Sequence, residues 1–289
     1  MKLNKRKLKF TAKPEKILGH FKILPPEETI DKILKDGSSI ARYGDGEFDF
    51  IYGIDMNYQK MDKDLSRRLK EVLLSKEENL LIGIPDPFNL EYCDKYTGRA
   101  IEFWPGWIRS YKFKLLKLLN KNRQYYSSLI TRFYLDYTDK SHVAGYVKKI
   151  KLLWDNKDIV IIEGTKSRLG VGNDLFQNAK SIQRIICPAE SAYSKYKEIL
   201  NEAKKISKDK IIFLALGPTA TVLAYDLYKL GYQTIDIGHV DIEYEWFLRK
   251  ATKKIKIEHK YVTEVADGRT NIEDVTDEKY KNEIIATII

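Results

Sequence analysis

The sequence predicts an α/β protein of the Rossmann-like kind, with a mostly parallel sheet and helices on both faces. Short apolar segments bounded by glycine or proline alternate with longer segments whose apolar residues recur every three to four positions. The short segments are almost continuously apolar, which is typical of strands buried on both faces. No composition break marks a linker, so we expect a single domain at 23–289 after a basic N-terminal arm at 1–22.

The predicted elements follow from local signals. Two prolines and two acids begin a helix at 25–36, which Gly37 ends. The other predicted helices cover 62–76, 108–120, 141–154, 190–206 and 218–230. The predicted strands cover 38–42, 80–84, 129–133, 158–163, 182–187, 211–216 and 233–237. Residues 86–110 are rich in aromatic side chains and are expected to be irregular.

Composition limits the class of protein. The 289 residues are 43% hydrophobic and 32% charged, which indicates a globular chain with a heavily charged surface. The sequence lacks an apolar run of about 18 residues, and its basic start has no apolar signal core, so we expect a cytoplasmic protein. The two distant cysteines, Cys93 and Cys187, indicate reduced thiols and argue against structural zinc.

The net charge of +10 is distributed unevenly. Residues 1–16 hold seven Lys or Arg against one Glu, and a second basic run covers 249–256. Such runs suggest peripheral contact with the anionic inner face of a membrane, although charge runs are more often solvated faces. No aromatic pattern of an RNA-binding sheet accompanies them, so we expect no nucleic-acid partner.

The first predicted strand leads into a glycine-flanked turn that carries two acids. Gly44 and Gly46 permit a positive φ or a close approach to a ligand. Asp45 and Glu47 offer carboxylate oxygens to one hard cation, Mn²⁺ or Mg²⁺. Arg42 offers a planar fork for phosphate. The alternative interpretation is a surface turn rich in glycine and aspartate.

Polar residues also follow the other predicted strands, and ligands of open α/β sheets bind beyond the carboxyl ends of strands. The turn after 158–163 contributes Ser167, Arg168, Gly172, Asn173 and Asp174. The strand at 211–216 leads to Gly217, Pro218 and Thr219, which open a helix at a place suited to phosphate oxygens. The last predicted strand leads to His239, Asp241, Glu243 and Glu245. Together they predict a site for a sugar nucleotide, with a further metal ligand and a general base.

Each of these features also has a structural alternative. The turn at 217–219 could serve only as a helix cap, and His239 could be a hydrogen-bonded core histidine. Glu243 and Glu245 could be first-turn acids favoured by a helix dipole. The turn at 164–172 contains neither a GxGxxG nor a Walker pattern, so NAD and P-loop NTPase functions are weakly supported.

With these residues in place, the sequence resembles the bacterial GT-D-fold glycosyltransferases. The matching segments are SIARYGDGEF at 39–48, EGTKSRLGVGNDLF at 163–176, ICPAE at 186–190 and the long segment at 214–247. The last is specific because of its length, whereas a DxE triplet alone is not. The resemblance implies a GT-D-type enzyme that transfers a sugar from a UDP-sugar, with Mn²⁺ or Mg²⁺ near a DxE motif.

Carried onto this sequence, the resemblance places the DxE motif at Asp45-Gly46-Glu47. The stretch from His239 to Glu245 resembles the rest of the active centre. Within it we assign His239 to the metal or the diphosphate and the role of base to Glu245, with Asp241 and Glu243 beside it. The implied nucleotide cradle comprises Arg42, Gly44, Ser167, Arg168, Gly172, Asn173, Asp174, Gly217, Pro218 and Thr219. We expect glucose as the donor sugar and a glycan or glycoprotein acceptor, recognised by residues 86–127.

Two other functions stay open at this point. A methyltransferase that uses S-adenosylmethionine would hold its cofactor with the glycine turns and would need no metal. A non-catalytic protein that binds nucleotides or polyanions would depend on the basic arm and would tolerate substitution of Asp45 and Glu245.

Overall fold

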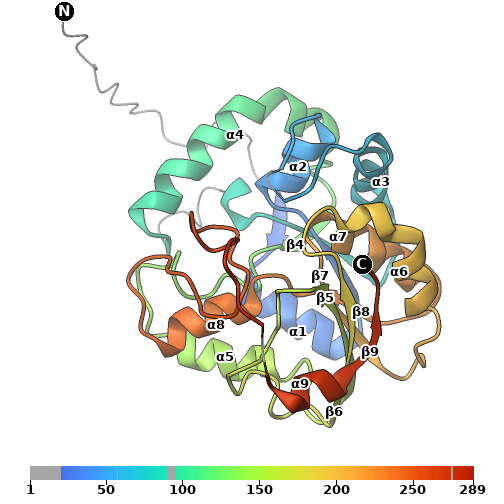
Figure 1. The fold of residues 1–289 in the computed structure, drawn as a ribbon. Coiled ribbons are helices and arrows are strands. Elements are labelled where there is room, and N and C mark those ends of the chain that lie inside the picture. Colours follow the sequence, from blue (N-terminus) through green and yellow to red (C-terminus); the bar gives the residue numbers. More distant parts are fainter. Residues whose placement is uncertain (1–20, 57, 90–94, 275) are drawn as a thin grey trace, which may run out of the picture.

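The computed structural model describes residues 21–56, 58–89, 95–274 and 276–289. Within them, nine strands form one sheet in the order β1-β4-β3-β2-β8-β7-β5-β6-β9. All the paired strands of this sheet run parallel. Figure 1 shows helices on both sides of the sheet. The predicted fold class is therefore confirmed.

The strands are β1 (Lys22–Leu24), β2 (Ser39–Arg42), β3 (Leu80–Ile84), β4 (Gln124–Ser127), β5 (Asp158–Gly164), β6 (Ser181–Cys187), β7 (Ile211–Ala215), β8 (Thr234–Asp236) and β9 (Ile284–Thr287). The α-helices are α1 (Pro26–Asp36), α2 (Asp45–Ile51), α3 (Lys63–Leu74), α4 (Gly98–Leu118), α5 (Val143–Lys151), α6 (Tyr196–Ala203), α7 (Pro218–Lys229), α8 (Val240–Leu248) and α9 (Glu278–Glu283). Two short 3₁₀ helices cover Asp86–Phe88 and Ala192–Lys195.

Two hydrophobic cores lie on opposite faces of the sheet. In β7, Ile212 and Leu214 belong to one core and Phe213 to the other, as the two-residue period of a strand requires. Helices α3, α6 and α7 pack into the first core, and α1, α5 and α8 into the second (Figure 1). Burial on both faces explains why the strands are apolar throughout.

Local signals set the bounds of several helices as predicted. Helix α1 begins at Pro26, and Gly37 ends it with a left-handed φ of 63°. Helix α3 is capped by Asp62, whose side chain accepts hydrogen bonds from the backbone N–H groups of Asp64 and Leu65. Helix α7 begins at Pro218, as expected from the sequence.

The segment predicted to be irregular is largely helical. Helix α4 runs without interruption from Gly98 to Leu118 and contains Pro105, so the predicted helix at 108–120 begins ten residues too late. Trp107 stacks on Tyr111, with ring centroids 4.5 Å apart, and on Phe88, at 5.9 Å. Proline has no backbone N–H, so Pro105 removes one hydrogen-bond donor from the helix. The aromatic packing explains why the helix tolerates this loss.

The strand predicted at 129–133 is wrong. The fourth strand lies earlier, at Gln124–Ser127, and the chain then turns, with Arg132 N donating to Leu129 O at 2.8 Å. Ser127 ends the strand because its Oγ accepts a hydrogen bond from Leu129 N. The apolar residues Ile130 and Phe133, which suggested a strand, are buried in the core under the sheet.

Both ends of the chain add strands that the sequence analysis did not predict. Phe21 is buried and Lys22 begins β1, so the basic arm is shorter than 1–22; residues 1–20 lie outside the described residues. The C-terminal strand β9 pairs with β6. Among the described helices, none is both long and apolar enough to cross a membrane.

The strand order creates a place for a ligand. Strands β3 and β4 lie on one side of β2, and β8, β7, β5 and β6 lie on its other side. The loops that leave the carboxyl ends of strands on either side of such a switch point separate and leave a crevice.

Candidate active site

A cavity of about 740 Å³ opens at this switch point, beside the loops that follow β2, β5, β7 and β8. Eight of the predicted site residues line it: Arg42, Gly44, Asp45, Glu47, Ser167, Gly217, His239 and Asp241. The other eight are not part of its lining: Arg168, Gly172, Asn173, Asp174, Pro218, Thr219, Glu243 and Glu245. The structure therefore brings half of the predicted set together.

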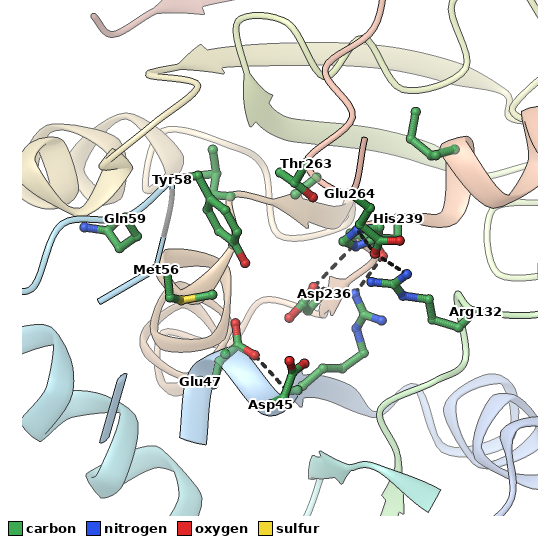
Figure 2. Close-up of a pocket in the computed structure, with 18 of the residues that line it drawn as sticks. Asp45, Glu47, Met56, Tyr58, Gln59, Arg132, Asp236, His239, Thr263 and Glu264 are labelled. Atoms are coloured by element: carbon green, nitrogen blue, oxygen red, sulfur yellow. Dashed lines mark hydrogen bonds and ion pairs between the residues drawn. The ribbon is translucent and has the colours of Figure 1, made fainter. Parts of the chain in front are cut away.

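The acidic wall of the cavity is the first turn of α2. Gly44 is the N-cap, and its N–H donates to Glu47 Oε2 at 2.7 Å, so the acids belong to a helix rather than to a free turn. A Cβ on Gly46 would lie 2.3 Å from Met56 Cε, so glycine allows Met56 to pack there. Figure 2 shows Asp45 and Glu47 on the opposite side of the cavity from His239 and Glu264.

Asp45 and Glu47 form a carboxyl pair whose charge is poorly compensated. Burial raises the pKa of Asp45, against the opposing charge of Arg132. Burial also raises the pKa of Glu47 to about 7, and the charges of Asp236 and Asp45 act in the same direction. A cation placed beside this pair would stabilise its ionised form.

Arg42 is held by the scaffold at the edge of the cavity. Its Nη1 donates to Ser128 O and Thr131 Oγ1, and its Nη2 donates to Asp236 Oδ1 and Gly238 O, all between 2.6 and 2.9 Å. The guanidinium thereby joins β2, β8 and the turn after β4. Arg42 lines the cavity, but these four hydrogen bonds hold its floor together.

The basic wall of the cavity consists of Arg132, Lys254 and His239. All three contact Glu264, which lies in the segment after α8. Glu264 forms ion pairs with Arg132 and Lys254, and its Oε1 lies 3.1 Å from His239 Nε2. Burial alone would raise the pKa of Glu264, but the charges of Arg132, His239 and Lys254 hold it far below its usual range. The carboxylate of Glu264 therefore contacts three nitrogen-bearing side chains that could instead donate hydrogen bonds to a phosphate.

His239 is oriented by backbone geometry and by this cluster. It is the N-cap of α8 and has a φ of 73°. Burial and the neighbouring charge of Arg132 lower the pKa of His239. Its Nε2 faces Glu264 rather than Asp45 and Glu47, so the predicted grouping of these three as metal ligands does not form.

The turn between β7 and α7 is built around a close contact. Gly217 has a φ of 54°, and a Cβ there would lie 2.8 Å from Tyr58 Cε2. Tyr58 is held in place because its carbonyl accepts a hydrogen bond from Ser191 N at 2.8 Å. Both Tyr58 and Gly217 line the cavity, whereas Thr219 is fully buried below it. Tyr58 therefore covers the turn that was predicted to cradle phosphate.

A fully paired network lies behind the cavity wall. Asp241 Oδ1 accepts hydrogen bonds from Gly170 N and Asn173 Nδ2, at 2.9 and 2.8 Å. The buried ammonium of Lys260 lies 2.6 Å from Asp241 Oδ2 and 3.2 Å from Glu245 Oε1. Glu245 also accepts from Asn173 and pairs with Arg249. These contacts hold Glu245 away from the cavity, contrary to its predicted role as base.

Three more predicted residues serve the scaffold. Glu243 Oε2 accepts from the backbone N–H groups of Tyr134 and Leu135, at 2.9 and 3.1 Å. Arg168 Nη1 donates to His259 O and Glu273 O, both at 2.7 Å. Asp174 pairs with Lys151 and Tyr244 on the protein surface. These contacts are made to other parts of the fold, and none of the three side chains lines the cavity.

Comparison with known proteins places this geometry in a family. A family model described as "Glycosyltransferase GT-D fold" matches residues 40–265. The chain belongs to this GT-D-fold family. It is 40% identical over 278 residues to "Probable glycosyl transferase Gly" of Streptococcus gordonii. It is 38% identical over 276 residues to "Glycosyltransferase GlyD" of Streptococcus pneumoniae serotype 4. These matches cover 96% and 95% of this chain but 40% and 33% of the relatives, so it spans less than half their length.

Solved structures agree with the family assignment. One, described as "The highly conserved domain of unknown function 1792 has a distinct glycosyltransferase fold", is 39% identical with a TM-score of 0.88, over 92% of this chain and 95% of the other. Another, "A New Glycosyltransferase (DUF1792) from Streptococcus sanguinis", is 40% identical with a TM-score of 0.88, over 93% and 100%. The predicted resemblance is confirmed, and the methyltransferase alternative loses its support.

The residues of this GT-D-fold chain fit a metal that is shared with a substrate. No group of three or more His, Cys, Asp or Glu within the described residues is arranged to hold a metal by itself. Asp45 and Glu47 nevertheless supply two half-buried carboxyl groups with raised pKa values. Mg²⁺ is usually held by one or two carboxylates together with substrate phosphates and water. The donor set therefore suits an ion that arrives with a diphosphate.

Sequence reasoning missed several residues that line the cavity of this GT-D-fold chain. Asp236 ends β8 beside the predicted site, and its place at the carboxyl end of a strand could have identified it. Tyr58, Lys254 and Glu264 lie in segments without regular structure. No local pattern marks Tyr58 or Glu264, and Lys254 was noted only as part of the basic run at 249–256. Only the tertiary fold brings these three to the cavity.

Proposed function

We propose that this chain transfers a sugar, with glucose as the first candidate, from a UDP-sugar to a glycan or glycoprotein acceptor, in a reaction that needs Mn²⁺ or Mg²⁺. The observation that carries the proposal is the cavity at the switch point, where the half-buried pair Asp45 and Glu47 lies opposite His239 and Glu264, and Glu264 pairs with Arg132 and Lys254. Family membership supports sugar transfer.

The two walls would divide the work of holding a diphosphate. When bound, the divalent ion would neutralise the charge that develops on the departing UDP. Asp45 and Glu47 would hold that ion through their carboxylate oxygens. Arg132 and Lys254 would donate hydrogen bonds to the phosphate oxygens, with Glu264 balancing their charge while no ligand is present. This arrangement stabilises charge on the leaving group without a covalent step.

Asp241 would act by positioning the site rather than by touching the reacting atoms. It lines the cavity, yet it holds Gly170 N, Asn173 and Lys260 at the same time. Those contacts connect the turn after β5 to the first turn of α8, which begins beside His239. A change at Asp241 would therefore move the cavity wall.

A peripheral membrane contact is a weaker part of the proposal. The first basic run lies at 1–16, outside the described residues. In the second run, Arg249 pairs with Glu245 and Lys254 pairs with Glu264, so two of its cations serve the fold and the cavity. Binding to anionic vesicles at physiological salt would support the contact, and its absence would remove it.

The test is a calorimetric titration of UDP and UDP-glucose with Mn²⁺, and again with EDTA. We expect wild-type protein to bind both only with the ion, and Asp45→Asn and Glu47→Gln to lose that binding. Glu243→Gln is the matched control because Glu243, like Glu47, has a pKa raised to about 7 mainly by burial, but lies outside the cavity. Binding that ignores the ion, or that falls equally in the control, would overturn the proposal.

A further inference from the structure

A second cavity, of about 510 Å³, shares a wall with the first. It lies between the start of α1 and the segments around Tyr96 and Tyr137. Tyr96 lines both cavities, and Asp136, which lines the first, precedes Tyr137, which lines the second. A ligand that fills the second cavity would therefore lie next to the proposed sugar-nucleotide site.

A buried carboxyl group with an unused acceptor lines this second cavity. Asp86, just beyond the carboxyl end of β3, is 2% exposed. Its Oδ2 accepts a hydrogen bond from Tyr96 Oη at 3.3 Å, but its Oδ1 has no hydrogen-bond partner among the described residues. Burial raises the pKa of Asp86 to about 7. Buried acceptors are normally paired, so an unpaired one at a cavity wall indicates a ligand.

The wall around Asp86 is already ordered for binding. Thr97 N donates to Asp136 O at 2.7 Å, and Thr138 N donates to Lys95 O at 3.1 Å, so two segments far apart in the chain run side by side. The rings of Tyr96 and Tyr137 lie 5.0 Å apart and are tilted by 52°. Fixed rings and fixed acceptors reduce the entropy that a ligand loses on binding.

The chemistry of the lining favours a neutral ligand that carries hydroxyl groups. Three acids, Asp86, Glu27 and Asp139, line the cavity together with Lys95 and His142, so the lining carries no excess of positive charge that would select an anion such as a phosphate. Tyrosine faces suit the C–H surface of a sugar ring, and a carboxylate oxygen accepts from its hydroxyls.

We propose that this second cavity binds a neutral sugar unit of the acceptor, with Asp86 accepting hydrogen bonds from its hydroxyls and Tyr137 packing against its ring. The proposal rests on the proposed function and names the acceptor site for the same reaction. It narrows the acceptor recognition expected of residues 86–127 to Asp86 and Tyr96, and adds Tyr137 on the side of the cavity nearest α1.

The experiment uses saturation-transfer NMR on the protein with UDP and Mg²⁺ present, because Mg²⁺ is diamagnetic and leaves the ligand signals sharp. The probes are the methyl β-glycosides of glucose, galactose and N-acetylglucosamine, with choline as a cationic probe. We expect saturation transfer to at least one glycoside, and its affinity should fall about fivefold or more in Asp86→Leu and in Tyr137→Ala. Asp31→Leu, an exposed change on α1, is the control and should bind as wild type does.

Calorimetric UDP binding, measured on the same samples, separates the two proposals. Unchanged UDP affinity in Asp86→Leu or Tyr137→Ala shows that the variant is folded and that only the second cavity has changed. UDP binding without any glycoside signal, with equal glycoside signals in all variants, or with a signal for choline alone would overturn the acceptor site. A wild-type protein that does not bind UDP with Mn²⁺ would overturn the proposed function and, with it, this inference.

Discussion

Two groups of carboxylates, one buried and one half-buried, lie beside the active-site cavity, and they differ in what balances their charge. Beside α8, Asp241 and Glu245 share the ammonium of Lys260 and the amide of Asn173. At the start of α2, Glu47 accepts from the backbone of Gly44, and the described residues provide no ion pair to it or to Asp45. The first group is complete within the protein, whereas the second is not.

The difference separates scaffold acids from ligand-binding acids. Both groups come from acidic stretches next to predicted strand ends, so a sequence pattern treats them alike. A buried charge is costly unless it is paired. The paired group therefore supports the fold, and the unpaired group is best explained by a cation that binds there. The following predictions test that contrast, from the largest expected effect to the smallest.

Removing the cation of the paired group should cost the most stability. Lys260→Met leaves Asp241 and Glu245 buried without their ammonium, and breaking a buried pair from one side costs about 3–5 kcal/mol. Thermal unfolding would measure the loss. Lys253→Met, an exposed change in the same segment, is the control. Equal melting temperatures for the two variants would show that the network does not stabilise the fold by this amount.

Glu47→Gln should damage activity rather than stability. Loss of an ion-binding carboxylate is expected to slow UDP release from UDP-glucose by about 100-fold, the size seen when one stabilising group leaves an active site. Glu243→Gln should stay within about threefold of wild type, because an amide oxygen can still accept from Tyr134 N and Leu135 N. Equal rates for the two variants would contradict the contrast.

Gly217→Ala should strain the turn that borders the unpaired group. The residue has a φ of 54°, and the new Cβ would meet the ring of Tyr58. We expect a loss of about 1–3 kcal/mol in the free energy of unfolding. Gly106→Ala, inside α4 with no atom within 4 Å of its Cβ, should be neutral or stabilising. Denaturant titration of both variants checks the difference.

Ion-dependent UDP binding should weaken as the pH falls through about 7. Because the pKa of Glu47 is raised to about 7 in the folded protein, the group holds its proton below that pH and must release it to bind a cation. Affinity should fall by up to about tenfold per pH unit below 7 and level off above it. Calorimetry from pH 5.5 to 8 measures the slope, and Glu47→Gln should lack it.

The same raised pKa has the opposite consequence for the unliganded fold. A carboxyl group with a raised pKa in the native state binds its proton more tightly there than in the unfolded chain. The stability that this tighter proton binding contributes is fully present below pH 4.5, the pKa of the group in the unfolded chain. It is lost as the pH rises toward 7, the pKa in the folded protein. Wild-type stability should therefore decline over that range without Mn²⁺, and Glu47→Gln should reduce the decline. A rise in stability would contradict this sign.

Much of the fold could be predicted because its signals are local. The apolar runs at 80–84 and 158–163, and the proline and glycine that bound α1, each identify an element without reference to the rest of the chain. The predictions were wrong where packing overrides local preference. Aromatic contacts allow α4 to continue through Pro105. The apolar residues at 129–133 are buried in the core although they belong to a turn.

The candidate site divides in the same way. The sequence by itself determined that the chain is a parallel α/β protein and that Asp45 and Glu47 follow the strand at 38–42, because strand periodicity and glycine turns are properties of neighbouring residues. Only the tertiary structure decided which acids stay uncompensated. That depends on partners such as Lys260 and Glu264, which reach Asp241 and Arg132 across 19 and 132 positions of chain. Charge balance is a property of the assembled cavity, and no local pattern contains it.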